Sequence, residues 1–163
     1  RKAVARLATN GAIRTHLDLI AGLPYDTLDT IARSFDQAYA LGPAHLQLGF
    51  LKVLPGTEMR ERAAEYALSY NPDPPYEVHE NRWISAGDLA SLRDIAALVD
   101  SLYNTGRFRA WLDAHEALHE GAFAMFRALA RHWRALGLQA RRKDPDAIAE
   151  ALAAFAAGDR AHP

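Results

Sequence analysis

The chain has 163 residues, of which 50% are hydrophobic and 24% are charged, and its formal net charge is −1. This composition is typical of a globular protein, and the near-neutral charge gives no electrostatic reason to expect binding to nucleic acid or to an anionic membrane. The sequence contains no cysteine, which excludes disulfides and any thiolate ligation of zinc or of an iron–sulfur cluster from within this chain.

The first stretch, residues 1–9, has helical character and ends at Asn10-Gly11. A natural chain rarely begins inside a helix without a residue that caps it. We therefore expect the sequence to be a fragment of a longer polypeptide.

Residues 13–23 alternate in polarity, which is typical of a β-strand. One face carries His16, Asp18, Ile20 and Gly22, and the other carries Leu17, Leu19, Ala21 and Leu23. Pro24 ends the strand. A helix is expected over residues 28–41, with Asp26 or Thr27 as its N-cap and Gly42-Pro43 as its end.

A second strand is expected over residues 45–54. Its apolar face carries Leu46, Leu48 and Phe50, and its other face carries His45, Gln47, Gly49 and Leu51. Two strands joined by a helix make a βαβ unit, the building block of parallel sheets and barrels. Because the helix must pack on the apolar faces, we expect the polar faces to look into the lumen of a barrel.

The second half of the chain has helical character. After a short helix over residues 58–66, a proline-rich stretch at 71–75 and an extended stretch at 76–83, the run from Ser85 to Asp88 indicates a helix start. Helices are expected over 89–102, 107–119, 122–136 and 145–156, with glycines 121, 137 and 158 at the breaks. The fold class is therefore α/β, with a partial (β/α) barrel over residues 1–84 and an all-helical extension over residues 85–163.

Four segments in a fixed order carry a family resemblance: Asp-Leu-Ile-Ala-Gly-Leu-Pro at 18–24, Leu-Gln-Leu-Gly-Phe-Leu-Lys at 46–52, Pro-Gly-Thr at 55–57 and Pro-Tyr-Glu-Val at 75–78. This series resembles the carboxy-terminal part of the radical S-adenosylmethionine (radical SAM) barrel, in particular the class with an amino-terminal cobalamin-binding domain. Residues 83–85 and 103–108 resemble the helical extension, of uncharacterised function, found in one branch of that class.

The resemblance implies a cytoplasmic enzyme that modifies an organic substrate through a 5′-deoxyadenosyl radical. Family members bind S-adenosylmethionine on a [4Fe–4S] cluster held by a CxxxCxxC loop, and this chain lacks that loop. We expect the chain alone to be inactive and to bind no cofactor by itself. The cluster, S-adenosylmethionine and cobalamin would belong to the full-length protein, and the substrate is not identified.

The resemblance also implies cofactor-binding residues on the two strands. They are Asp18, Ile20, Gly22, Gln47, Gly49 and Leu51. Ile20 and Gly22 would approach the adenine, while Gln47, Gly49 and Leu51 would line the lumen. For Asp18 and His16 we favour the alternative that they fasten neighbouring strands, and the two glycines have the alternative role of relieving crowding. No residue is assigned as catalytic or as a metal ligand.

One motif supports a competing hypothesis. The run from His115 through Glu116 to His119 matches H-E-x-x-H, which on a helix places two zinc ligands on one face with the glutamate as base. Zinc needs a third protein ligand, for which His132 and Glu150 are candidates. Because their spacing singles out neither residue, we favour a solvated helix face over a zinc hydrolase.

A third hypothesis is a non-catalytic module in which the helical half binds a partner or mediates dimer formation. Cutting a barrel leaves the strand at residues 16–22 with an unpaired edge, and such edges readily pair with other chains. We expect this edge to pair with another copy of the chain or to be covered by the amino-terminal helix.

Overall fold

The computed structural model describes residues 14–138 and 144–159. In these residues the elements follow in the order β1 (His16–Ala21), α2 (Leu28–Tyr39), β2 (His45–Phe50), α3 (Glu58–Glu61), β3 (Ser69–Tyr70), β4 (Val78–Glu80), α4 (Ala86–Leu98), the π-helical turn η1 (Val99–Tyr103), α5 (Arg109–Glu116), α6 (Ala122–Ala135) and α7 (Pro145–Asp159). The helix expected over residues 1–9 lies outside the described residues.

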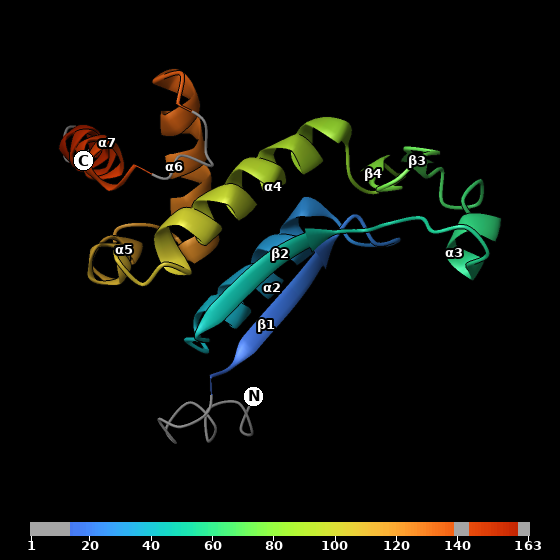
Figure 1. Ribbon diagram of the computed structural model, residues 1–163, viewed down its shortest axis with the longest axis horizontal. Helices are drawn as coiled ribbons and strands as arrows, with labels where there is room; N and C mark the ends of the chain where they lie inside the picture. The colour runs from blue at the N-terminus through green and yellow to red at the C-terminus, as the bar shows by residue number, and fades with distance from the viewer. Residues whose placement is uncertain (1–13, 139–143, 160–163) are drawn as a thin grey trace.

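The predicted βαβ unit is confirmed. Strands β1 and β2 pair in parallel, in a register that runs from His16 beside His45 to Ala21 beside Phe50, and α2 lies against one face of the sheet (Figure 1). Helix α2 begins after Thr27, whose hydroxyl accepts a hydrogen bond from the Thr30 backbone N–H. The Thr30 hydroxyl in turn accepts from the Thr27 backbone N–H. The α/β class agrees with the prediction, whereas the described residues form no closed barrel and the partial barrel stays a prediction.

Beyond the end of β1, the segment that leads into β4 lies beside the continuation of β2, in the position that β1 holds earlier along that strand. The Leu51 N–H still donates to Ala21, but the Val53 N–H donates to Tyr76, and Leu51 accepts from the Val78 N–H. Strand β4 also pairs antiparallel with β3, a short strand that the sequence pattern did not indicate. These segments therefore cover the end of the sheet where β1 turns away.

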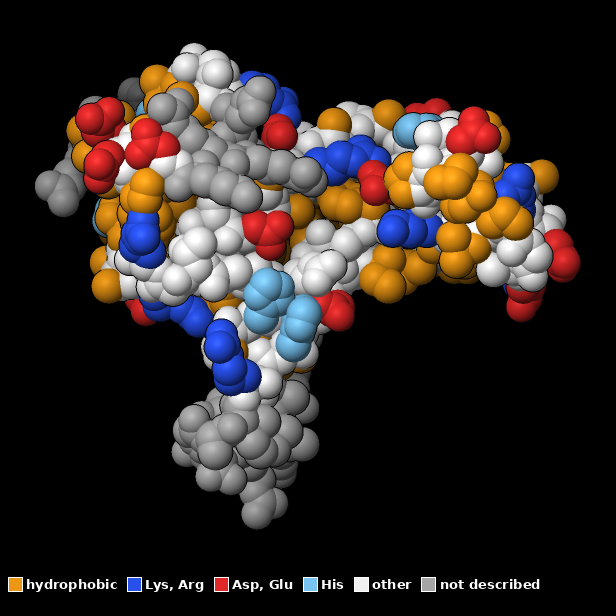
Figure 2. Space-filling view, viewed as in Figure 1, with side chains coloured by type: hydrophobic (Ala, Val, Ile, Leu, Met, Phe, Trp, Pro, Cys, Tyr) orange, Lys and Arg blue, Asp and Glu red, His pale blue; other side chains and the backbone are white. Residues whose placement is uncertain are grey.

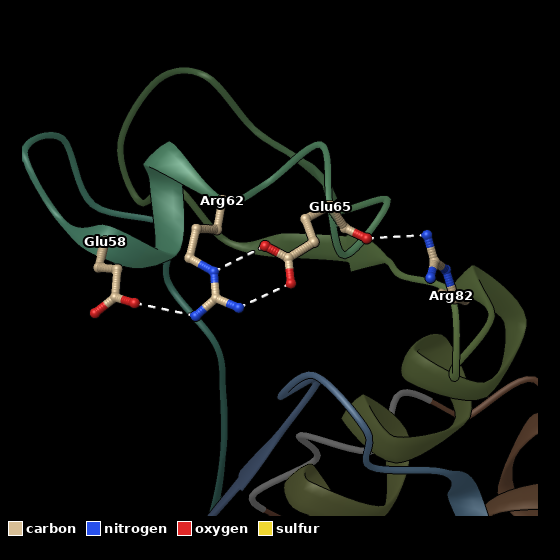
Figure 3. A network of polar contacts seen from close by, with 4 residues as sticks. All are labelled: Glu58, Arg62, Glu65 and Arg82. Carbon is tan, nitrogen blue, oxygen red and sulfur yellow. Dashed lines mark hydrogen bonds and ion pairs between the residues drawn. The ribbon is translucent and has the colours of Figure 1, made fainter.

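Helix α3 is shorter than the predicted helix over residues 58–66, and a polar network surrounds its end (Figure 3). The Arg62 guanidinium donates to Glu58 at 3.0 Å and to both carboxylate oxygens of Glu65 at 2.8 and 2.9 Å, which holds the pKa of Glu65 below its usual range. The Glu65 carbonyl accepts from Arg82 at 2.9 Å. Because these groups are exposed to solvent, the network orders the turn more than it stabilises the fold.

The helical half follows the predicted pattern closely. Helix α4 begins at the expected capping box, in which Ser85 and Asp88 each cap the other's backbone N–H. Helix α5 is shorter at both ends than predicted, and α7 continues through Gly158 to Asp159. The expected break at Gly158 is therefore wrong, since a glycine in the last turn of a helix costs too little to end it.

One hydrophobic core joins the two halves of the chain. Phe35 of α2 is fully buried, with ring centroids 5.8 Å from Phe123 and 5.7 Å from Phe126 of α6. Asp36, the next residue of α2, accepts a 2.7 Å hydrogen bond from the Phe123 N–H and so caps α6 from another helix. The division at residue 84 stays a prediction, but the packing across it is continuous.

None of the helices within residues 14–138 and 144–159 combines the length and apolar character that crossing a bilayer requires.

Candidate functional site

The sheet formed by β1 and β2 has one packed face and one open face. Leu46 and Leu48 are buried in the hydrophobic core, whereas Asp18 and Gln47 are exposed, and Ile20 is 52% exposed. Figure 2 shows histidine side chains side by side over the start of these strands, next to an acidic side chain. The predicted alternation is thus confirmed, and the face that it assigned to the lumen is open in the described part of the chain.

A small polar cluster occupies the start of the open face. The His16 Nε2 atom lies 2.7 Å from Oδ1 of Asp18, and the His16 and His45 rings meet edge to face with centroids 4.4 Å apart. Asp18 therefore contacts its own strand, while His16 makes the contact to the neighbouring strand. The predicted role of fastening strands is seen for His16 and not for Asp18.

Gly22 and Gly49, the two glycines among the predicted site residues, have different surroundings. Gly22 has a φ of +89°, and a Cβ atom on it would lie 2.6 Å from Cγ1 of Val78. It is buried beneath β4 and is not part of the open face. A Cβ atom on Gly49 would meet only the Leu19 carbonyl, at 3.6 Å. Relief of crowding thus explains Gly22, whereas the space above Gly49 is open.

Asn81 is a buried polar residue that sequence reasoning missed. Its Nδ2 atom donates to the Gly22 carbonyl at 2.9 Å and to the Leu23 carbonyl at 3.5 Å, while its Oδ1 atom accepts from the N–H groups of Trp83 and Ile84. A single asparagine in an irregular stretch has no periodicity, so the sequence carries no signal for this role. Asn81 fixes the loop that follows β1 to the start of the helical half.

The loop after β1 places an aromatic side chain at the surface. Tyr25 has a φ of +70° and is 66% exposed, and its ring centroid lies 4.5 Å from that of Trp83. Trp83 in turn lies 6.2 Å from the Tyr66 ring. Trp83 therefore packs between the loop after β1 and the turn after α3.

A cavity of about 850 Å³ lies beside β2, between that strand and helices α4 and α6. Small side chains line part of it (Ala96, Ala97 and Ala130), and charged residues also line it (Lys52, Glu77, Arg93, Asp94, Asp100 and Arg134). Two of the cations are paired, Arg93 with Glu77 at 2.7 Å and Arg134 with Asp94. No local sequence pattern indicates this cavity, because its lining comes from segments far apart in the chain.

The H-E-x-x-H motif does not form the geometry that zinc requires. Helix α5 ends at Glu116, so His119 lies in the following turn and not on the same helix face as His115. The His115 ring stacks on Trp111 at 3.8 Å, and its Nδ1 atom lies 2.8 Å from the Trp111 carbonyl. The expected solvated face is also wrong, because both histidines are half-buried. Among the described residues, no group of three or more potential ligands could hold a metal ion.

The unpaired edge of β1 is present as expected, since β1 pairs only with β2 in the described part of the chain. The amino-terminal segment that was expected as one of two covers lies outside that part. Pairing with another copy therefore stays a prediction.

Comparison with known proteins gives one match. A family model described as "Protein of unknown function (DUF4080)" matches residues 64–162, from the turns before β3 to the end of the described chain and beyond. No curated protein and no solved structure matched the chain. The family match begins within the predicted first domain and leaves β1 and β2 outside it. The chain belongs to this family, DUF4080.

Proposed function

We propose that this chain is the carboxy-terminal part of a radical SAM enzyme and that the open face of β1 and β2 is one wall of its cofactor and substrate site. The observation that carries the proposal is the contrast between the two faces of this sheet. One face is covered by α2, while the other holds the exposed side chains of Asp18, Ile20 and Gln47. The ordered sequence motifs on the same strands supply the class of reaction.

The residues of this chain fit S-adenosylmethionine, but they do not fit the iron–sulfur cluster. No cysteine is available for a cluster, so ligation of iron must come from outside this chain. A nucleoside needs an apolar surface and a few hydrogen-bonding groups, and the open face offers Ile20 for the first and Gln47 and Asp18 for the second. Gly49 leaves the centre of this face free for close approach.

When bound, S-adenosylmethionine would supply, together with a cluster, the radical that removes hydrogen from an organic substrate. The residues of this chain would bind and orient that group rather than carry out the chemistry. Asn81 would act indirectly, because it holds the loop after β1 in place through the Gly22 carbonyl.

The coding sequence upstream of Arg1, read in frame, gives the first test. We expect it to encode a CxxxCxxC loop before the strand at β1. A start codon directly before Arg1 would overturn the proposal and would favour the non-catalytic interaction module.

A binding experiment on the polypeptide that includes the upstream region tests the wall itself. Gly49→Leu places a bulky side chain on the open face, whereas Gly87→Leu makes the same change in the first turn of α4, where a Cβ atom would meet only Oγ of Ser85, at 3.8 Å. We expect equilibrium dialysis under anaerobic conditions to show at least tenfold weaker S-adenosylmethionine binding for the first variant only. Equal affinities in both variants would remove the open face from the site.

A further inference from the structure

The outer edge of β2, on the side away from β1, already holds one amide group. Asn104, just after η1, donates from Nδ2 to the Leu46 carbonyl at 2.9 Å, and its Oδ1 accepts from the Leu46 N–H at 2.9 Å. A residue of a neighbouring strand forms the same kind of paired contact with a sheet edge. This edge is therefore shaped to bind an amide that approaches in the plane of the sheet.

The next outward-facing residues along this edge are Leu48 and Phe50. The N–H groups of His45 and Leu51 donate toward β1, so by the alternation of a strand the backbone groups of Leu48 and Phe50 point the other way. Within residues 14–138 and 144–159, no hydrogen bond reaches these outward groups. Both residues line the cavity of about 850 Å³.

The cavity has the size and the charge balance of a site for an uncharged ligand. Its volume falls within the range of about 300–1,000 Å³ that is usual for ligand sites. Among the residues that the structure describes, three cations and three anions line it, and two ion pairs neutralise most of them. An anionic ligand would gain little from such a lining, whereas an uncharged chain of amides would find hydrogen-bonding partners along the strand.

We propose that this cavity binds a short, extended, uncharged peptide segment of another protein, which pairs with Leu48 and Phe50 as a third strand of the sheet. Leu48 and Phe50 are two residues apart, roughly 6.6 Å along the strand. A ligand that pairs with both of them therefore needs successive amide groups. The small side chains of Ala96, Ala97 and Ala130 leave room for a side chain of that peptide. Strand addition at an open edge is a general mode of peptide recognition.

A second copy of this chain is a poorer occupant of the cavity. Helix α4 runs alongside β2 (Figure 1), and its residues Ala96 and Ala97 line the cavity. Strand β1 of another copy would bring its own β2 and α2 with it, which is more than a cavity of about 850 Å³ holds. The cavity also reaches Gln47 and Gly49 of the proposed cofactor wall, but the pairing proposed here uses the backbone edge at Leu48 and Phe50 and not the side chains of the open face.

The test uses the full chain and a set of N-acetylated, C-amidated pentapeptides that lack charged residues and differ at the central position. Fluorescence polarisation of labelled peptides measures affinity, and amide hydrogen exchange locates the contact. We expect at least one peptide to bind and to slow exchange at Leu48 and Phe50 at least tenfold, with no change in the outward amides of β1.

Two variants of α4 provide the matched comparison. Ala96→Leu fills the cavity, whereas Ala90→Leu makes the same change at an exposed position of the same helix. We expect peptide affinity to fall at least tenfold in the first variant and to change less than twofold in the second, with both variants keeping a cooperative thermal transition.

Four results would overturn the proposal. They are the absence of any peptide that protects Leu48 and Phe50, equal affinity in the two variants, equal affinity for N-acetylalanine amide, or protection of these amides that depends on protein concentration alone. The third would indicate a small amide ligand, and the fourth a second copy of this chain.

Discussion

The helical half and the β1/β2 half of the molecule differ in how their side chains are buried. In the helical half, residues such as Leu92, Met125 and Trp133 are almost wholly buried, and the helices pack against one another over much of their surface. In the β1/β2 half, one face is equally well packed while the other leaves Ile20 half-exposed. The helical half therefore contributes mainly buried apolar surface, whereas the sheet also presents one face that is open among the described residues.

The largest expected effect on stability comes from Phe35, whose ring joins the two halves of the molecule. Phe35→Ala removes a fully buried ring between α2 and α6, and such deletions cost about 3–5 kcal/mol. Because the core is continuous, we expect circular dichroism during urea unfolding to show both halves losing structure in one transition at lower urea. Ile20→Ala on the open face should change the free energy of unfolding by less than about 0.5 kcal/mol.

A separate, unchanged transition of the helical half in Phe35→Ala would contradict this view. The two halves would then be independent domains, as the predicted division at residue 84 implies. Equal losses of stability in the Phe35 and Ile20 variants would mean instead that the open face is covered in solution.

An intermediate effect is expected where the halves are joined by polar contacts. Asn81→Ala leaves the Gly22 carbonyl and the N–H groups of Trp83 and Ile84 without their partner. Buried groups left unsatisfied cost about 1–3 kcal/mol each, and relaxation recovers part of this. We expect a loss of about 2–3 kcal/mol in chemical denaturation, together with faster amide exchange in the loop after β1.

Asn71 provides the control for this variant, because its side chain accepts one local, exposed hydrogen bond, from the Asp73 N–H. Asn71→Ala should therefore leave the loop after β1 unchanged. The role of Asn81 as a positioning residue is refuted if the two variants show the same exchange rates in that loop.

The smallest effects concern two buried tyrosines with opposite hydrogen-bonding states. Tyr103 donates from its hydroxyl to the Pro43 carbonyl at 2.8 Å, whereas the buried hydroxyl of Tyr39 has no hydrogen-bond partner among the described residues. We expect Tyr103→Phe to lower the free energy of unfolding by about 1 kcal/mol and Tyr39→Phe to raise it by a similar amount. Thermal denaturation at pH 7 would detect both, and a loss in Tyr39→Phe would show that its hydroxyl has a partner.

The same two tyrosines make the stability of the fold depend on pH in the alkaline range. Burial raises the pKa of both tyrosines above its ordinary value, and for Tyr39 the carboxylates of Asp113 and Glu116 add to the effect. The unfolded chain releases these protons near pH 10 while the folded chain keeps them. The contribution of these two tyrosines to stability is therefore constant below about pH 10 and falls above it, and Tyr39→Phe should reduce the slope of that fall.

Local patterns in the sequence predicted most of the secondary structure correctly. The alternation in β1 and β2, the N-cap at Thr27 and the capping box from Ser85 to Asp88 depend on neighbouring residues only, and all are seen. The end of α5 was misjudged: the helix ends at Glu116, and the turn that follows brings the His119 ring to 6.0 Å from the Phe155 ring of α7. A short strand such as β3 has too few residues to show a period.

The sequence by itself determined the βαβ unit, the helical half and the faces of the strands, since periodicity and caps act over a few residues. Only the tertiary structure decided that Gly22 lies beneath Val78, that Asn81 and Asn104 hold the sheet from the helical half, and that a cavity opens beside β2. Asn81 and Asn104 bond residues 58 or 59 positions away in the chain. A local pattern carries no record of such a partner, because the packing of whole elements brings the two together.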